Sequence, residues 1–309
     1  MNISEIIVIV FGLALFEIIS SIDNAVINAD VLATMSERAR QWFLRYGIFF
    51  AVFVARGFMP LIIVFLTNPS MGIVGAFTAT FSSDPKVIEA IEHSKPLLLA
   101  GGGIYLVYLF LHWLFIEVKE YAFFIEKFGH HKLSFWFYTA VSILLLWFAF
   151  ATININPMIT LGAMIGSSAF FITNGFKKNA EEKEQQLTHS HISNISKIIY
   201  LEVIDTTFSI DGVLGAFAFT LSVPLIILGN GLGAIVVRYV TIHGVKTVKK
   251  YRFLKNGAMY SVGALGVVMM MESLAVHIYT LLPPIITVLV VGIFFWLSVR
   301  ELKTEEIIK

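Results

Sequence analysis

The chain has 309 residues, of which 57% are hydrophobic and only 14% are charged, and its mean hydropathy is +0.82. So few charges cannot cover a water-soluble globule, in which about 25% of residues are charged, so lipid must replace much of the surrounding water. A formal net charge of +1 gives no basic field for a nucleic acid, and the lack of cysteine excludes disulfides, thiolate metal sites and iron–sulfur clusters. Any metal would have oxygen or imidazole ligands.

Nine stretches of the chain are long and apolar enough to cross a bilayer as helices, which takes about 20 residues each. We therefore predict an all-α, polytopic membrane protein with about nine transmembrane helices and no separate soluble domain. The first stretch is expected to remain in the mature protein, because no Lys or Arg precedes it. The predicted spans are residues 6–28, 42–66, 96–116, 135–151, 157–172, 198–221, 223–242, 257–281 and 283–299.

The distribution of Lys and Arg supports an odd number of spans. Eighteen of the 22 basic residues follow the odd-numbered spans, and only Lys86 and Lys95 lie on the other side. The remaining two, Arg56 and Arg238, fall within spans. Because cytoplasmic loops carry the excess of basic residues, we expect the N-terminus outside and the C-terminus in the cytoplasm.

Two parts of the sequence are similar to each other in the same order. Residues 16–26 align with 204–214, and residues 96–116 align with 256–276. Five spans separate the starts of the two units, so the units would enter the membrane from opposite faces, and we predict an inverted three-plus-three helix repeat. The aligned pairs include Glu17 with Asp205, Asp23 with Asp211, Arg56 with Arg238, Lys95 with Lys255 and Gly103 with Gly263. The predicted organisation is one membrane domain, 1–309, with a first three-helix repeat (1–116), a connecting region with two helices (117–195), a second, inverted three-helix repeat (196–281), and a final helix with a cytoplasmic tail (282–309).

Acidic side chains within the spans carry the chemical signal. They outnumber the two arginines there, and each charge at the centre of a bilayer costs about 2.5–3.5 kcal/mol. A cationic partner must therefore compensate them, and protons or metal ions are the candidates. The acids are Glu17, Asp23, Glu202, Asp205, Asp211 and Glu272.

Helical spacing groups several of these oxygens. Glu17 and Asn24 share one face of their span, as do Glu202 and Asp205 in the second repeat. The predicted cation ligands are Glu17, Asp23, Asn24, Glu202, Asp205 and Asp211. We expect Arg56 and Arg238 to act as counter-ions or in gating, and we interpret Glu272 as part of a candidate proton route.

Two of the acids need a local break in their helices to join the others. Asp23 and Asp211 each lie six residues, or about 9 Å along a continuous helix, from the upstream acid of their repeat. Asp-Asn and Asp-Gly favour turns, so we predict unwound stretches at residues 23–24 and 211–212 that bring side chains and carbonyl groups around one cation.

The two acidic motifs, Phe16-Glu17 with Ser-Ile-Asp23-Asn24 and Glu202 with Asp205 and Phe-Ser-Ile-Asp211, resemble those of the TerC/Alx family of integral membrane proteins in the LysE-type transporter superfamily. The resemblance covers most of the chain. It implies export of manganese, a link to tellurite resistance by older naming, and a place in the bacterial inner membrane. It also implies that Glu17, Asp23, Asp205 and Asp211 are the functional acids.

Three functions remain to be compared. The first is proton-coupled export of a divalent cation by alternating access, because oxygen ligands suit hard cations; manganese is chosen by the resemblance alone. The alternatives are an exporter of a small organic, cationic solute and a non-transporting membrane assembly factor. No common enzyme motif occurs, so we expect no enzyme and no tightly bound cofactor. The expected partners are lipid, a divalent cation and protons; the sequence does not indicate an oligomeric state. The histidine pairs at 130–131 and at 189 and 191 are interpreted as solvated loop residues.

Overall fold

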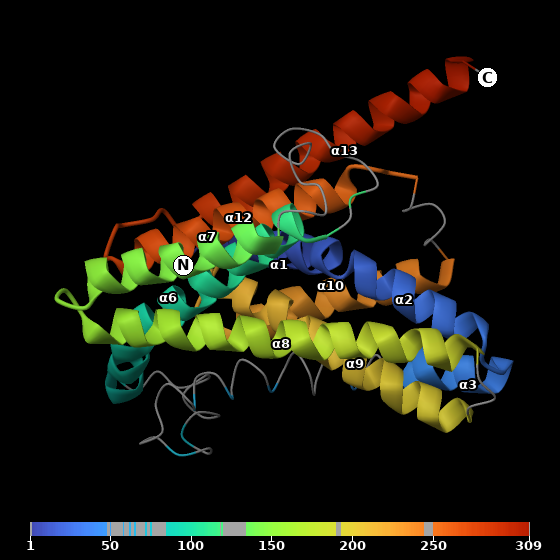
Figure 1. Ribbon diagram of the computed structural model, residues 1–309, viewed down its shortest axis with the longest axis horizontal. Helices are drawn as coiled ribbons and strands as arrows, with labels where there is room; N and C mark the ends of the chain where they lie inside the picture. Colours follow the sequence, from blue (N-terminus) through green and yellow to red (C-terminus); the bar gives the residue numbers. More distant parts are fainter. Residues whose placement is uncertain are drawn as a thin grey trace.

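The computed structural model describes residues 2–47, 85–117, 134–189, 193–243 and 250–308, with a few single residues outside these ranges. All regular secondary structure in them is helical, as predicted, and Figure 1 shows the helices packed as one bundle. In chain order they are α1 (Ile3–Ser20), α2 (Ile22–Ala33), α3 (Glu37–Trp42), the π-helix η1 (Phe43–Gly47), α6 (Pro85–Phe115), α7 (Ser134–Thr152), α8 (Pro157–His189), α9 (Asn194–Ala216), α10 (Val223–His243), α12 (Leu254–Ser273) and α13 (Leu282–Ile308).

Six of the described helices are long and apolar enough to cross a membrane, which is typical of an integral membrane protein. They correspond to predicted spans one, three, four, five, seven and nine. The sixth and eighth spans are present as the more polar helices α9 and α12, whereas most of the second span, 42–66, lies outside the described residues. The six stretches are Ile3–Ser20, Ser94–Phe115, Phe135–Thr152, Pro157–Asn179, Val223–Thr241 and Leu282–Thr304.

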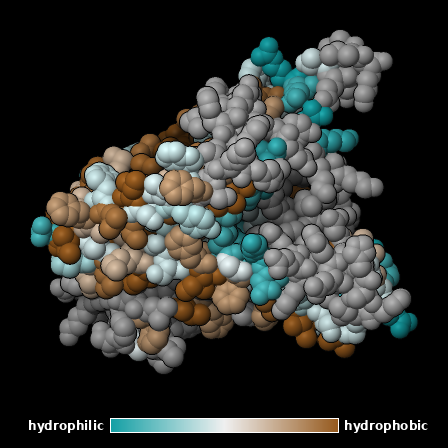
Figure 2. Space-filling model, viewed as in Figure 1, coloured by the Kyte–Doolittle hydropathy of each residue, from teal (hydrophilic) through white to brown (hydrophobic). Residues whose placement is uncertain are grey.

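The surface of the bundle matches a hydrocarbon environment. On α7, Phe135, Leu146 and Phe150 are 71%, 70% and 85% exposed, which would be a severe aggregation hazard in water. Figure 2 shows that hydrophobic residues cover much of the described surface over α7 and α8. These side chains are therefore expected to contact lipid.

Two helices extend farther than their apolar windows indicated. The predicted span 157–172 is part of α8, which continues to His189, and the span 96–116 is part of α6, which begins at Pro85. The predicted loops at 173–197 and 67–95 are therefore wrong over residues 173–189 and 85–95. A hydropathy window ends where charges begin, but the Ala-, Glu-, Lys- and Gln-rich stretch after Thr173 still favours a helix. In contrast, α12 ends at Ser273, before the predicted end of its span at 281.

Close backbone contacts hold α6 between α8 and α12. A Cβ at Gly101 would lie 2.9 Å from the carbonyl oxygen of Gly162 on α8, and a Cβ at Gly103 would lie 2.9 Å from that of Gly266 on α12. Small residues that permit such approaches are the usual means of joining helices in membranes. The glycines thus bring the three helix backbones into direct contact.

Ion pairs lie near both ends of the α6–α12 contact. Lys95 and Glu272 are 2.9 Å apart at one end, and Lys255 and Glu117 are 2.8 Å apart at the other. Lys95, in the N-terminal half of α6, lies near the C-terminal end of α12, and Lys255, at the start of α12, lies near Glu117, just after the end of α6, so the two helices are antiparallel.

This arrangement can be tested in the protein as it is, because its sequence contains no cysteine. We expect the double variants Lys95→Cys/Glu272→Cys and Glu117→Cys/Lys255→Cys each to cross-link in the membrane with a short bismaleimide, since the partly exposed side chains meet. The measurement is the mobility of a protease-nicked chain on a denaturing gel. The control pair, Lys95→Cys/Lys255→Cys, lies at opposite ends of helices about 30 Å long and should not react intramolecularly; the reverse result would contradict the antiparallel contact.

Candidate functional site

Glu17 is completely buried in the last turn of α1. The Ser21 hydroxyl donates a hydrogen bond of 2.8 Å to Glu17 Oε1, and the carboxylate lies against Gly212 of α9. The Glu17 side chain also packs against Gly233 of α10, where a Cβ would come within 2.8 Å of Glu17 Cγ. The two glycines therefore leave the space that this carboxylate occupies.

The unwinding predicted at residues 23–24 is wrong, because both residues are helical in α2. α1 ends at Ser20 and α2 begins at Ile22, with Ser21 at φ −97° and ψ 5° between them. Asp23 therefore lies in the first turn of α2. The side chains of Asp23 and Asn24 are outside the described residues.

The unwinding predicted at residues 211–212 is wrong. α9 runs without interruption from Asn194 to Ala216, so Asp211 and Gly212 are both helical. Gly212 is required for close packing against Glu17 rather than for a turn. Because hydrocarbon offers no water to a freed backbone group, keeping the helical hydrogen bonds outweighs the turn preference of Asp-Gly.

Asp211 accepts two interactions from neighbouring helices. The Tyr105 hydroxyl on α6 donates a hydrogen bond of 2.5 Å to Asp211 Oδ1, and Lys177 on α8 forms an ion pair with Oδ2. The Thr173 hydroxyl, one turn before Lys177, lies 2.9 Å from the Tyr105 hydroxyl. Lys177 lies in the predicted connection 173–197, and the prediction of a loop there is wrong because α8 continues past Thr173.

Asn230 on α10 is a polar residue of the site that the sequence reading missed. It is fully buried, and its Nδ2 donates a hydrogen bond of 3.4 Å to the Gly212 carbonyl oxygen. Its Oδ1 accepts no hydrogen bond from the described residues. A polar side chain inside an apolar span often marks a functional site, so the sequence alone could have identified Asn230 as a candidate site residue.

Asp211 and Gly212 are thus the meeting point of five helices. We call this the 211–212 junction, and it is formed by Asp211, Gly212, Glu17, Tyr105, Lys177 and Asn230. Helices α1, α6, α8, α9 and α10 each contribute at least one of these residues. The junction concentrates two carboxylates, an ammonium group, a phenol and an amide away from solvent.

The other two acids of α9 lie toward its N-terminal half. Asp205 is 5% exposed, and the Ser209 hydroxyl donates to the Asp205 backbone carbonyl rather than to a carboxylate. Glu202 lies 3.9 Å from Arg238, whose guanidinium stacks 4.1 Å above the Phe43 ring. Arg238 is therefore a counter-ion for Glu202 in the structure, and its aligned residue, Arg56, lies outside the described residues.

Glu272 does not reach this interior. It lies at the end of α12, its side chain is 23% exposed, and it forms the ion pair with Lys95. The nearby His277 is exposed, and His112 packs against the rings of Phe137 and Phe170. The side chains of the remaining predicted loop histidines, at 130–131, 189 and 191, are outside the described residues.

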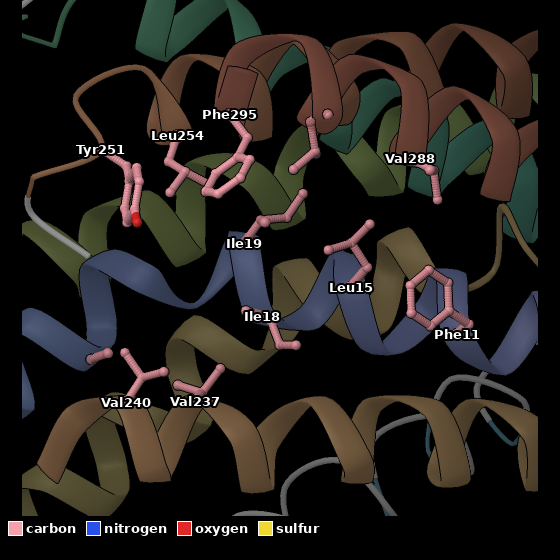
Figure 3. A pocket seen from close by; sticks show the side chains of 13 residues that line it. Phe11, Leu15, Ile18, Ile19, Val237, Val240, Tyr251, Leu254, Val288 and Phe295 are labelled. Atoms are coloured by element: carbon pink, nitrogen blue, oxygen red, sulfur yellow. The ribbon is translucent and has the colours of Figure 1, made fainter. Parts of the chain in front are cut away.

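No three acidic or histidine side chains approach closely enough to hold a metal among the residues that the structure describes. That set does not contain the side chain of Asp23. A cavity of about 410 Å³ between α1, α10, α12 and α13 lies on another face of α1 (Figure 3). Leu15, Ile18, Val237 and Phe295 are among its lining residues, which are apolar apart from Tyr251, so the cavity cannot replace the hydration of a cation.

A family model described as "Protein of unknown function (DUF475)" matches residues 22–305. The chain belongs to this family. The match begins just after the break at Ser21, so it includes Asp23, Lys177 and Asp211 but not Glu17. Neither the curated proteins nor the solved structures contain a match to the chain.

The packing of Glu17 on Gly212 makes a specific stability prediction. We expect Gly212→Ala to destabilise the protein by about 1–3 kcal/mol, because the new methyl group overlaps the buried carboxylate. Apparent Tm in detergent measures the effect. Gly175→Ala on α8 is the matched control, since no atom lies within 4 Å of its added Cβ and the gain in helix propensity is the same. Equal Tm values for the two variants would contradict the contact, and Glu17→Asp should partly rescue Gly212→Ala.

Proposed function

We propose that this protein is a membrane transporter that exports a divalent cation. The observation that carries the proposal is the burial of Glu17, Asp205 and Asp211, which are 0%, 5% and 8% exposed inside a bundle of membrane-crossing helices. Carboxylates in such a position are costly and are usually found on ion or substrate routes. A purely structural role would be served at lower cost by apolar side chains.

The type of ligand supports a hard cation. The polar atoms at the 211–212 junction are carboxylate, hydroxyl and amide oxygens together with the Lys177 ammonium. Oxygen ligands suit manganese, magnesium and calcium, and the chain has no thiolate to favour a softer metal. Manganese is preferred on the resemblance to the TerC/Alx family.

We also propose that the chain contains the inverted repeat and has nine spans, with the C-terminus in the cytoplasm. Reciprocal contacts between α6 and α12 support the repeat. A Cβ at Gly103 would meet Met270, and a Cβ at the aligned Gly263 would meet Phe110, which aligns with Met270. Each aligned lysine, Lys95 and Lys255, pairs with a glutamate near the far end of the other helix. Such reciprocity is expected of two units related by a two-fold axis in the membrane plane.

Alternating access would then expose the carboxylates first to one side of the membrane and then to the other. A potential of 100 mV, negative inside, opposes export by about 2.3 kcal/mol per charge, so a divalent ion needs an energy source. Entry of protons that compete for the same carboxylates supplies it.

The first test is transport by purified protein in proteoliposomes with a manganese-sensitive dye. We expect Asp23→Asn and Asp211→Asn to weaken Mn²⁺ binding about 10- to 100-fold, because each removes a charged ligand while keeping its volume. Glu17→Gln and Asp205→Asn should reduce transport as well, mainly through the proton step. Glu37→Gln is the control, since this side chain is 67% exposed on α3. Unchanged Mn²⁺ affinity of the Asp23→Asn/Asp211→Asn double variant would refute a central site.

The second test concerns coupling. We expect a protonophore to abolish Mn²⁺ accumulation against its gradient in inside-out vesicles, and we expect each Mn²⁺ pulse to produce an opposite movement of protons. A pH-sensitive dye measures the second effect. Accumulation that continues at the same rate without a proton gradient would rule out this coupling.

Export of a small organic cation is the second candidate, and one observation favours it. Asp211 already binds an alkylammonium group in the structure, that of Lys177. Competition between Mn²⁺ and a lysine-like amine in the same vesicles separates the two functions. The true substrate should be transported, whereas the other cation should at most inhibit that transport.

A further inference from the structure

Lys177 occupies the position at Asp211 that a transported cation would need. The side chains of Lys177 and Asp211 are 12% and 11% exposed, and their ion pair lies within the predicted ligand set. The other carboxylate oxygen of Asp211 accepts the hydrogen bond from Tyr105. Both oxygens of the carboxylate are therefore engaged by this chain's own groups.

The surrounding helices hold this arrangement in register. Gly101 on α6, four residues before Tyr105, packs directly against the backbone of Gly162 on α8. Tyr105 in turn contacts Thr173, one turn before Lys177 on the same face of α8. The close contact between α6 and α8 thus positions the Lys177 ammonium beside Asp211.

Lys177 lies close to the end of the membrane-crossing part of α8. The next two residues of α8, Lys178 and Asn179, are exposed, and Asn179 ends the membrane-crossing stretch of the helix. A lysine near the end of a membrane helix can direct its long apolar stem along the helix and keep its charge at the interface. The ammonium can therefore leave the site without losing its charge.

We propose that Lys177 is a tethered competitor cation, which closes Asp211 while the site is empty and swings to the water-facing end of α8 when a divalent cation binds. This inference rests on the proposed function. It assigns to Lys177 the role of a specificity residue: only a cation that binds more strongly than the internal ammonium opens the site. It also keeps Asp211 compensated in the return step of the transport cycle, when no substrate is bound and the protons occupy Glu17 and Asp205.

The lack of cysteine permits a direct test of the charge at this position. Purified full-length Lys177→Cys protein is treated either with 2-bromoethylamine, which restores an ammonium at lysine length, or with methyl methanethiosulfonate, which leaves a small neutral group. We expect the neutral form to bind Mn²⁺ about tenfold more tightly in calorimetry than the aminoethylated form, which should match the unmodified protein. Lys178→Cys with the same two reagents is the matched control and should show no difference. In an Asp211→Asn background the difference at residue 177 should vanish.

Displacement is measured separately in the unmodified chain, because loss of one member of a buried ion pair can prevent folding. Acetic anhydride labelling, followed by mass spectrometry, reports how accessible each lysine is. We expect saturating Mn²⁺ to raise the labelling of Lys177 several-fold and to leave Lys178 unchanged.

The outcomes distinguish the inference from the proposed function. Mn²⁺ affinity that is the same for both adducts, or Lys177 labelling that Mn²⁺ does not change, would overturn the tethered competitor while leaving cation transport in place. Absence of Mn²⁺ binding by every form would overturn the proposed function, and the inference with it.

Discussion

A carboxylate surrounded by hydrocarbon must receive from the protein what water would otherwise supply, and this requirement organises the centre of the molecule. Glu17 accepts a hydrogen bond from Ser21, Glu202 lies beside Arg238, and Asp211 is held by Tyr105 and Lys177. Arg238, Tyr105 and Lys177 come from other helices than the acids they contact, so these helices cannot slide past one another without leaving a charge in an apolar environment. The acids thus determine helix register as well as any chemistry.

Glycine provides the second condition, because a charged group fits between helices only where side chains make room. Gly212 and Gly233 border Glu17 on two sides, and Gly101 and Gly103 let α6 approach α8 and α12. In a membrane there is little hydrophobic drive for helices to associate, so close van der Waals contact and polar contacts must suffice. Glycine therefore serves twice in this bundle: two glycines make room for a buried carboxylate, and two others let the helices pack closely.

The sequence predicted the parts of this structure that depend on local composition. The bounds of α7, the burial of Glu17 and the position of Arg238 within a span follow from apolar windows and from the rarity of charge inside them. The errors arise where tertiary contact decides. The Asp-Gly pair at 211–212 remains helical because Gly212 packs on Glu17, and Lys177 belongs to the interior because its helix continues beyond the last apolar residue. Single-sequence reasoning treats a charge as the end of a span, whereas an ion pair with Asp211 makes it part of one.

The two ion pairs between α6 and α12 have a further consequence for a protein whose helices cross a membrane. Lys95–Glu272 and Lys255–Glu117 lie at opposite ends of the same antiparallel contact, and all four side chains are partly exposed. Dissolved salt screens exposed charges over about 10 Å at 0.1 M, and it cannot pass through the bilayer to the other end. In the proposed nine-span topology, the ionic strength of each compartment acts on its own pair alone, and a difference in salinity across the membrane would loosen one end of the helix pair relative to the other.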